Sequence, residues 1–340
     1  MDLVVTFLGT AASVPSAARG TSATLITRRG TRWLVDCGEG TQRQFLRSGL
    51  GLVELDAVLV THLHGDHVLG LPGLIKTYTL RDRARPLLLA GPPGLVALLT
   101  EMRMVVGRLP AWLEIEEIGA GTVLRDEGAG VVAFHTDHGL PSLGYAVVED
   151  PRPGQFDVAA ARALGVPEGP LFGTLQRGGE VTLDGGRVVR PDEVLGPPRP
   201  GRRVVVSGDT RPCESTAAAA KGASLLVHEA TFATEDRSRA VETRHSTARE
   251  AAEVARAAGV RLLALTHLSA RVQPREARRE AEEVFPHVVV PRDFDEVDIP
   301  FPERGGPELI PAGSARRGAG AGGGEPPASG RPATFSTTDL

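Results

Sequence analysis

The sequence predicts an α/β fold in which layered β-sheets are covered by helices. Short leucine-rich or β-branched runs, each ending in polar residues, alternate with segments of helical periodicity from residue 2 to about residue 300. Strands that alternate with helices form sheets whose faces the helices cover. The chain of 340 residues, 41% of them hydrophobic, is long enough for one large domain or two smaller ones.

The strand signals are of two kinds. Residues 2–9 (DLVVTFLG) alternate apolar and polar side chains and end on glycine, and residues 22–27 and 32–38 flank an Arg28-Arg29-Gly30 turn, which predicts a hairpin. The second kind is an apolar run with histidine or acidic residues where the strand should end. Runs of this kind are 56–62 (DAVLVTH), 204–210 (VVVSGDT), 224–231 (SLLVHEAT) and 261–269 (RLLALTHLS).

Helices are predicted between these runs. Residues 40–49 and 93–107 are candidates, residues 246–258 carry a Thr247/Glu250 capping-box pair, and residues 274–285 begin with proline in the first turn. From Arg304 the composition changes to glycine, alanine, proline and serine. A segment of that composition cannot bury enough apolar surface to offset its ordering entropy, so we expect residues 304–340 to be a disordered tail.

Composition excludes several classes of protein. A net charge of −4 argues against a protein that grips nucleic acid over its whole surface, although a local basic patch remains compatible with it. Two cysteines provide no disulfide framework. The first residues, MDLVVTFLGT, do not resemble a signal peptide, and no window reaches the ~18 apolar residues of a membrane span. We therefore expect a cytoplasmic protein with no membrane partner.

One stretch concentrates metal-binding chemistry. His62, His64, Asp66 and His67 lie within six positions at the end of an apolar run. A lone histidine there would favour a polar turn, but four donors this close together cost desolvation and electrostatic strain unless a cation compensates. Imidazole and carboxylate ligands suit zinc, and also iron or manganese. His62 and His64 would point the same way in an extended chain, and Asp66 and His67, after Gly65, would face a second point.

Three further donors follow other predicted strands. His138 follows the alternating run 130–138 (GVVAFHTDH), Asp209 follows VVVSG, and His267 follows LLALT. Each by itself could equally be a helix cap or a core histidine. Their shared position at strand ends favours ligands, and an aspartate with two carboxylate oxygens is suited to bridge two metals.

With these motifs the sequence resembles the metallo-β-lactamase superfamily and, within it, the ribonuclease Z family of tRNA 3′-processing endonucleases. The resemblance runs from FLGTAASVP near the start to RDFDEVDIP at 292–300. THLHGDH is common to the superfamily, whereas the set of HEATF and RHST is more specific. The resemblance implies an αββα sandwich, with two mixed sheets packed face to face and helices on both outer faces. It assigns residues 1–303 to the catalytic domain and residues 150–180 to an inserted substrate-binding arm.

The resemblance also implies the roles of single residues. His62, His64 and His138 would hold one Zn²⁺, Asp66, His67 and His267 would hold another, and Asp209 would bridge them; Mn²⁺ or Co²⁺ would suit the same ligands. Asp66 would also accept a proton, and His245 would protonate the leaving 3′ oxygen, with Glu229 orienting it. The alternative for His245 is a cap of the helix that begins near Ser246.

The implied activity is hydrolytic removal of the 3′ trailer from precursor tRNA, leaving a 3′-hydroxyl, by a homodimer. Two alternatives stay open: a dinuclear hydrolase of small phosphodiesters or sulfate esters, and a non-catalytic metal-binding or RNA-binding module. Gly169 and Pro170 match the arm's Gly-Pro motif, and Arg152, Arg162 and Arg177 could contact phosphates within a segment of mixed charge. The family's P-x-K-x-R-N loop keeps Arg19 but has Ala17 and Gly20 at the lysine and asparagine positions, which puts discrimination against CCA-ending tRNA in doubt.

Overall fold

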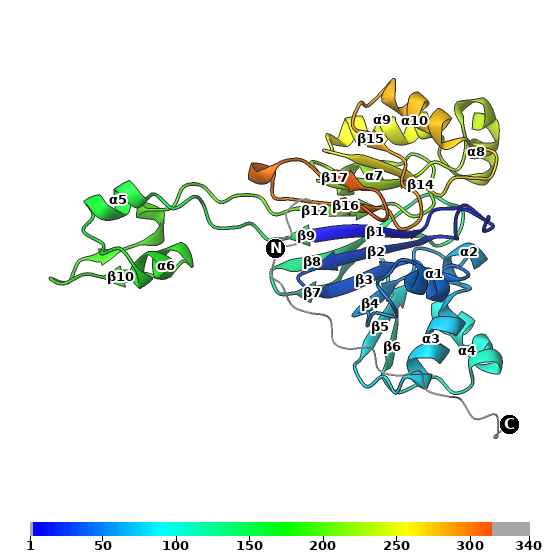
Figure 1. Cartoon of the computed structure of the whole chain (residues 1–340), viewed down its shortest axis with the longest axis horizontal. Coiled ribbons are helices and arrows are strands. Elements are labelled where there is room, and N and C mark those ends of the chain that lie inside the picture. Colours follow the sequence, from blue (N-terminus) through cyan, green and yellow to red (C-terminus); the bar gives the residue numbers. More distant parts are fainter. Residues whose placement is uncertain (1–2, 315–340) are drawn as a thin grey trace.

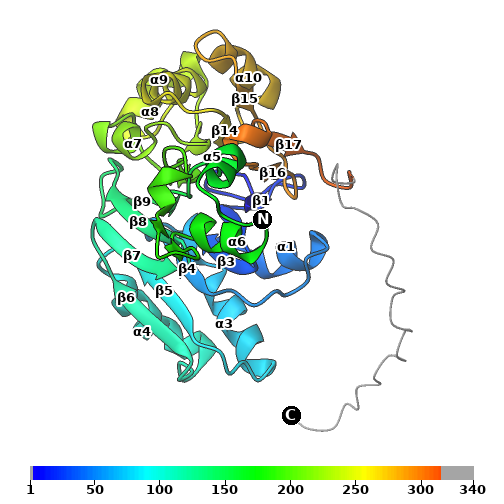
Figure 2. The same ribbon diagram turned by 90° about the vertical axis from the view of Figure 1, so that its left-hand side faces the viewer.

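The computed structural model describes residues 3–314 and shows the expected sandwich. Two mixed sheets pack face to face, helices lie on both outer faces, and a slender arm projects away from the sandwich (Figure 1). The view along the arm shows the two sheets and their covering helices as successive layers (Figure 2). The predicted α/β fold class is therefore confirmed.

The first sheet has eight strands. The strands β2 (Ala23–Arg28) and β3 (Thr31–Val35) form the predicted hairpin, which turns at Arg29 and Gly30, both in the left-handed region of φ. The strands β3 to β6 run parallel to one another, and the remaining neighbours are antiparallel. In spatial order the strands are β17 (Glu308–Ile310), β16 (Glu296–Asp298), β1 (Leu3–Gly9), β2 (Ala23–Arg28), β3 (Thr31–Val35), β4 (Ala57–Leu59), β5 (Leu87–Gly91) and β6 (Leu113–Glu117).

The second sheet has seven strands, of which β12 to β15 are parallel and β7, β8, β9 and β12 are antiparallel neighbours. In spatial order they are β15 (Val288–Val289), β14 (Leu263–Thr266), β13 (Leu225–Glu229), β12 (Arg203–Val206), β9 (Leu143–Glu149), β8 (Ala129–His135) and β7 (Gly121–Asp126). Because the parallel strands all run the same way, their carboxyl ends meet at one edge of the sheet.

Three buried apolar clusters hold the four layers together. One lies between the sheets and includes Phe7, Trp33 and Tyr145. A leucine-rich cluster joins the first sheet to α1 (Thr41–Arg47), α3 (Leu71–Leu80) and α4 (Leu95–Val106). An alanine-rich cluster joins the second sheet to α7 (Glu214–Ala219), α9 (Ala248–Ala258) and α10 (Pro274–Glu282). The alanines on α9 allow this helix to lie close to the sheet.

Several local predictions are confirmed by the helix ends. The capping box of α9 is present, with the Thr247 side chain accepting from the Glu250 N–H and the Glu250 carboxylate accepting from the Thr247 N–H. The helix α10 begins at Pro274. The short helix α2 (Gly65–Val68), which carries Asp66 and His67, and the helix α3 that comes after it were not predicted. Three glycines and a proline within residues 65–73 obscured the helical periodicity of α2 and α3.

The arm is a small folded unit inserted between β9 and β12. It contains α5 (Val158–Ala163), α6 (Pro170–Gln176), the two-stranded sheet of β10 (Val181–Thr182) and β11 (Val188–Val189), and the 3₁₀ turn Pro191–Glu193. Its own apolar cluster includes Ala161, Leu175 and Val194. The antiparallel bridge between Arg152 and Arg199 closes its neck. The folded arm thus extends to about residue 199, beyond the expected boundary at 180, because β10, β11 and Val194 complete its core.

The expected start of the disordered tail at residue 304 is also wrong. The strand β17 pairs with β16, and the Asp295 carboxylate accepts a hydrogen bond from the Ala312 N–H, so the chain stays attached to the first sheet beyond Arg304. The apolar Leu309 and Ile310 supply the burial that composition alone did not reveal. The rest of the predicted tail, residues 315–340, lies outside the described residues.

Candidate metal centre

Loops from both sheets bring the predicted ligands to one edge of the sandwich. His62, His64, Asp66 and His67 follow β4, His138 lies between β8 and β9, and Asp209 and His267 follow the parallel strands β12 and β14. In the open edge of an α/β sheet the carboxyl ends of parallel strands are where functional side chains gather. The seven side chains form two adjacent groups, and a third group joins His245 to Asp209 and His267.

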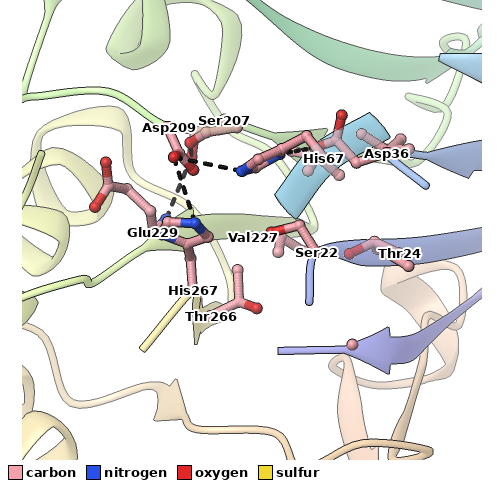
Figure 3. A pocket seen from close by; sticks show the side chains of 15 residues that line it. Ser22, Thr24, Asp36, His67, Ser207, Asp209, Val227, Glu229, Thr266 and His267 are labelled. Carbon is pink, nitrogen blue, oxygen red and sulfur yellow. Dashed lines mark hydrogen bonds and ion pairs between the residues drawn. The ribbon is translucent and has the colours of Figure 1, made fainter. Parts of the chain in front are cut away.

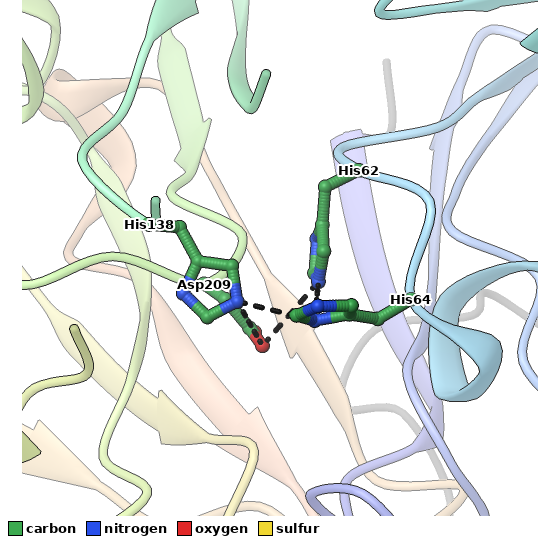
Figure 4. Close-up of side chains that lie close together, drawn as sticks. All are labelled: His62, His64, His138 and Asp209. Carbon is green, nitrogen blue, oxygen red and sulfur yellow. Dashed lines mark hydrogen bonds and ion pairs between the residues drawn. The ribbon is translucent and has the colours of Figure 1, made fainter. Parts of the chain in front are cut away.

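The first group consists of three histidines and one aspartate (Figure 4). His64 Nδ1 lies 3.0 Å from His62 Nε2 and 3.2 Å from His138 Nε2. Asp209 Oδ2 lies 3.7 Å from His62 Nε2 and 3.8 Å from His138 Nε2. Four ligand atoms from three separate loops therefore surround one point.

The second group consists of Asp66, His67 and His267. Asp66 Oδ2 lies 3.2 Å from His267 Nε2 and 3.6 Å from His67 Nε2. The same Oδ2 atom of Asp209 that faces the first group lies 3.4 Å from His67 Nε2 and 3.3 Å from His267 Nε2 (Figure 3). Asp209 thus lies between the two groups, where a bridging carboxylate would be.

The spacing of these atoms agrees with metal coordination. A tetrahedral zinc ion with bonds of about 2.0–2.1 Å holds its ligand atoms about 3.3 Å apart. Hydrogen bonding accounts for only part of this spacing, because His64 Nδ1 faces two imidazole nitrogens and a neutral imidazole carries a single N–H. His138 Nδ1 donates to the Arg244 carbonyl oxygen at 3.1 Å and His67 Nδ1 donates to Asp36 Oδ2 at 2.8 Å, which leaves both Nε2 lone pairs directed at the centre. His67 Nε2 is buried without a hydrogen-bond partner. The residues therefore fit a divalent metal site.

A second layer of side chains orients these histidines, and sequence reasoning missed it. Asp36 accepts from His67 and also from the Thr61 N–H and hydroxyl. The Thr231 hydroxyl lies 2.9 Å from His267 Nδ1 and 3.2 Å from His245 Nδ1. Such partners fix the tautomer and the ring orientation of a ligating histidine. Asp36 directly follows β3, and this position at the end of a strand is its only signal in the sequence.

His245 and Glu229 lie beside the two groups. The His245 Nδ1 lies 2.8 Å from Glu229 Oε1, and the fully buried Glu229 carboxylate also accepts from the Thr210 and Ser246 N–H groups. Burial by itself lowers the pKa of His245, but the Glu229 carboxylate outweighs burial and raises this pKa to about 9. Bound cations would act in the opposite direction. Thr247, and not His245, caps α9, which removes the alternative reading of His245 as a helix cap.

The electrostatics of Asp209 also favour an ionised bridge. Burial alone would raise the pKa of this carboxyl group, but the imidazoles of His267, His67 and His62 outweigh burial and lower the pKa well below its usual value. Beneath Asp209 and His67, between the two sheets, lies a cavity of about 20 Å³, enough for one water molecule. Ser207, Glu229 and Asp36 contribute polar atoms to its lining (Figure 3).

Arg19 does not project freely toward the centre. Its guanidinium donates to the Thr10 hydroxyl and to the Pro291 carbonyl oxygen, so it fastens the loop after β1 to the segment before β16. The same loop reaches the metal centre through Ser13, whose N–H donates to Asp66 Oδ2 at 2.7 Å. Ala17 is exposed on this loop, whereas the Gly20 N–H donates to the buried Asp293.

The arm residues lie far from the centre in the same chain. Gly169 and Pro170 begin α6 on the exposed surface of the arm. Arg162 is paired with Glu168, and Arg152 lies at the root of the arm, where it pairs with Glu303 and stacks on the Phe301 ring. Of the three arginines proposed to contact phosphate, Arg152 and Arg162 are therefore already engaged by carboxylates.

Comparisons with known proteins agree with this geometry. A family model described as the metallo-beta-lactamase superfamily matches residues 17–174, and one described as the beta-lactamase superfamily domain matches residues 194–268. A ribonuclease Z of Halorubrum lacusprofundi is 49% identical over 89% of this chain and 99% of its own length. A ribonuclease Z of Myxococcus xanthus is 50% identical over 83% of this chain and 93% of its own length.

Solved structures show the same fold. The crystal structure of human tRNase Z, short form, is 28% identical, covers 87% of this chain and 99% of that chain, and has a TM-score of 0.62. A metallo-β-lactamase fold protein of Bacillus subtilis is 19% identical over 87% of this chain and 99% of that chain, with a TM-score of 0.65. Within residues 3–314, no helix is both long enough and apolar enough to cross a bilayer.

Proposed function

Because the chain belongs to the ribonuclease Z family of the metallo-β-lactamase superfamily, we propose that it removes the 3′ trailer of precursor tRNA. As a metal-dependent endoribonuclease it hydrolyses one phosphodiester bond and leaves a 3′-hydroxyl on the tRNA. The single observation that carries the proposal is the shared position of Asp209, whose Oδ2 atom lies within 3.3–3.8 Å of ligand nitrogens from both groups. That arrangement suits two cations held side by side.

In this proposal His62, His64 and His138 would hold one zinc ion, Asp66, His67 and His267 would hold the other, and Asp209 would bridge them. Mn²⁺ or Co²⁺ would suit the same ligands. Bound in this way, two cations would supply a hydroxide nucleophile near neutral pH and would neutralise negative charge on the phosphoryl oxygens. Asp36 and Thr231 keep His67 and His267 in the tautomer that presents Nε2.

Protons are handled by side chains at the edge of the two groups. Glu229 holds the His245 ring through Nδ1, so the opposite nitrogen, Nε2, can carry the proton that the leaving 3′ oxygen requires. The raised pKa of His245 supports its role as the acid. Asp66 accepts the proton released when water attacks, and the Ser13 N–H holds its Oδ2 atom in position.

The arm is proposed to bind the body of the tRNA through the exposed α6 and its Gly169-Pro170 start. Strand polarity indicates whose metal centre it serves. The strand β9 runs away from the centre and ends at Glu149, and β12 begins at Arg203 and runs back toward the centre. The arm therefore leaves the sandwich at the end opposite to the centre (Figure 1). The seven residues of β9 span about 20 Å. An arm that points away from its own centre supports a homodimer in which it serves the partner's centre. We propose the cytoplasm, where precursor tRNA is processed, as the compartment.

The alternative of a small-ester hydrolase is not favoured, since the relatives named ribonuclease Z match nearly the whole chain, arm included. A non-catalytic module is not favoured either, because every ligand position is filled.

The structure suggests a clean test of the RNA assignment. Residues 154–196 are replaced by a short glycine linker, because the backbones of Gly154 and Gly196 touch and the Arg152–Arg199 bridge below them is kept. We expect cleavage of a CCA-less precursor tRNA to be lost while hydrolysis of bis(p-nitrophenyl) phosphate persists. Equal activity on both substrates after the replacement would contradict the tRNA assignment. A CCA-ending precursor, assayed in parallel, reports on the altered loop at Ala17 and Gly20.

The dimer has a test of its own. The arm-less protein is mixed with Asp66→Ala protein, which keeps its arm but lacks a working centre. If the arm acts on the partner's centre, mixed dimers regain cleavage of precursor tRNA. If the arm acts within one chain, no mixture is active, and light scattering that finds a monomer would exclude the dimer directly.

A further inference from the structure

Two arginines border the metal centre without belonging to either ligand group. We propose that Arg211 and Arg244 together bind a backbone phosphate of the RNA next to the scissile phosphate. The proposal rests on the RNA substrate proposed above and adds a phosphate subsite to that centre.

Both arginines are attached to residues of the centre. Arg211 comes two residues after Asp209, and its N–H donates to the Asp137 carbonyl oxygen at 3.1 Å. Arg244 immediately precedes His245, and its carbonyl oxygen accepts from His138 Nδ1 at 3.1 Å. The stem of Arg244 passes over Gly139, where a Cβ atom would lie 3.3 Å from Arg244 Cδ. The backbone of the ligand loops therefore fixes where both side chains start.

One carboxylate holds the two guanidinium groups side by side. Asp137 Oδ2 accepts from Arg211 Nε at 2.7 Å, and Asp137 Oδ1 accepts from Arg244 Nη1 at 3.1 Å. Each arginine thus uses one of its five N–H donors on Asp137. The two side chains are 47% and 49% exposed, and among residues 3–314 neither has another hydrogen-bond or ion-pair partner for its side chain. The cluster carries one net positive charge, and its two half-exposed guanidinium groups keep N–H donors that Asp137 does not use.

This arrangement suits a phosphodiester better than a purely structural role. Exposed ion pairs stabilise a fold little, so tethering the loops would not require two arginines on one carboxylate. A planar guanidinium forms paired hydrogen bonds with phosphate oxygens, and two of them held in advance lose less entropy on binding. Phosphate contacts of this kind set the register of a nucleic acid on a protein.

The position of Arg244 indicates which phosphate is bound. His245, its neighbour, is the proposed proton donor to the leaving 3′ oxygen, which stays with the tRNA. The arginine pair therefore lies on the tRNA side of the cut, and we assign to it the phosphate immediately upstream of the scissile one. By binding that phosphate, Arg211 and Arg244 would act as positioning residues for the scissile bond.

The test measures binding, with metal removed by EDTA so that no RNA is cleaved. Affinity for a CCA-less precursor tRNA is measured by fluorescence anisotropy over a range of salt concentrations for Arg211→Gln, Arg244→Gln and the double variant. Glutamine can still donate to Asp137, so the loops keep their tether while the charge is lost. We expect about a tenfold loss of affinity for the double variant, with the slope of log affinity against log salt smaller by about one phosphate contact. Arg239→Gln, on the exposed surface of the helix α8 (Arg237–Thr243), is the matched control and should bind as the wild type does.

A neutral phosphate identifies the contact. A precursor with one methylphosphonate immediately upstream of the cleavage site should bind the wild type about tenfold more weakly than unmodified precursor does. The double variant should bind the modified and the unmodified precursor with equal affinity. The proposal would be overturned if the affinity losses caused by the methylphosphonate and by the double substitution were additive. It would also be overturned if the double variant had the affinity and the salt slope of the wild type. If the wild type itself binds precursor tRNA no better than an unrelated RNA hairpin, the proposed function fails first, and this inference falls with it.

Discussion

The metal centre and the arm of this chain differ in where their residues come from in the sequence and in what holds them in place. The centre takes its side chains from loops throughout the chain and holds them in a buried network in which Asp36, Glu229 and Thr231 each satisfy several partners. The arm is continuous in sequence, is held by one small apolar cluster, and shows a surface of mixed charge. Catalytic side chains must keep their positions closely, whereas a long substrate can be bound by a small unit that is held less firmly. The two regions should therefore fail in different ways.

Removal of one ligand of the centre should have the largest effect. Asp66→Ala deletes both a proposed metal ligand and the proton acceptor, and we expect cleavage of precursor tRNA and of bis(p-nitrophenyl) phosphate each to fall by roughly 10³-fold or more. Steady-state kinetics on both substrates measure this loss. Glu101→Ala removes an exposed carboxylate on α4 and should leave both rates unchanged. A variant at Asp66 that loses only one of the two activities would contradict the shared role of the centre.

The root of the arm, where the two regions meet, should have the next largest effect. Glu149 is buried and accepts hydrogen bonds from Arg28 and Arg202, so Glu149→Gln removes the negative charge that these two buried arginines share and leaves Arg28 with the more distant Asp126, at 3.6 Å. Breaking a buried pair in this way costs about 3–5 kcal/mol. Denaturant unfolding of the whole chain should report this loss, while the metal content of the folded protein stays the same.

The same carboxylate predicts a pH dependence of stability. Burial alone would raise the pKa of Glu149, but hydrogen bonds from Arg202 and Arg28 outweigh burial and lower the pKa from 4.5 to about 2. Its contribution is therefore fully present above pH 4.5 and is lost as the pH falls from 4.5 toward 2, in total about 3 kcal/mol. The unfolding free energy of Glu149→Gln should fall less steeply across that range than that of the wild type. If the unfolding free energies of the wild type and of Glu149→Gln changed in parallel with pH, Glu149 would not be a cause of the pH dependence.

A cavity in the core of the arm should affect only one function. Leu175 is fully buried in the arm cluster, and a Leu→Ala change at such a site costs about 2–5 kcal/mol, which a cluster this small cannot absorb. We expect Leu175→Ala to expose the arm to proteolysis and to weaken binding of precursor tRNA about tenfold or more. Hydrolysis of the small ester and the melting temperature of the sandwich should stay unchanged. Leu226→Ala, in the alanine-rich cluster under α9, is the matched control that should lower the melting temperature instead.

The smallest effect is expected for the exposed contacts at the root. Glu303 pairs with Arg152 and Arg199 on the surface, and exposed pairs contribute little. Glu303→Gln should leave the melting temperature unchanged and alter the KM for precursor tRNA by no more than about threefold. A larger change in KM would mean that this pair sets the direction of the arm.

The centre could be predicted from the sequence because four of its proposed ligands lie close together in the chain. Four donors within six residues after β4 required a cation, and strand ends gave the rest, since parallel strands bring their carboxyl ends together. Asp36 and Thr231 were missed because each touches the centre only through a histidine. A single aspartate or threonine at the end of a strand carries no pattern that distinguishes it from a turn residue.

The arm and the end of the chain were harder to delimit for physical reasons. Strands of two residues, such as β10 and β11, show no alternation, and the far end of the arm was hidden by its glycine- and proline-rich sequence. The strand β17 lies among glycines and prolines and was read as part of the tail, because its pairing with β16 and the packing of Leu309 against the core between the sheets leave no pattern in the sequence. Tertiary context decided both boundaries.

The number of metal ions bound per chain tests the central claim most directly. Protein purified with zinc is dialysed and analysed by mass spectrometry, alongside His64→Ala, which lies only in the first group, and Asp209→Ala, which lies between the two groups. We predict two ions for the wild type, one for His64→Ala, and fewer than one for Asp209→Ala. A wild type with a single ion, or an Asp209→Ala variant that keeps two, would contradict a pair of cations bridged by that carboxylate.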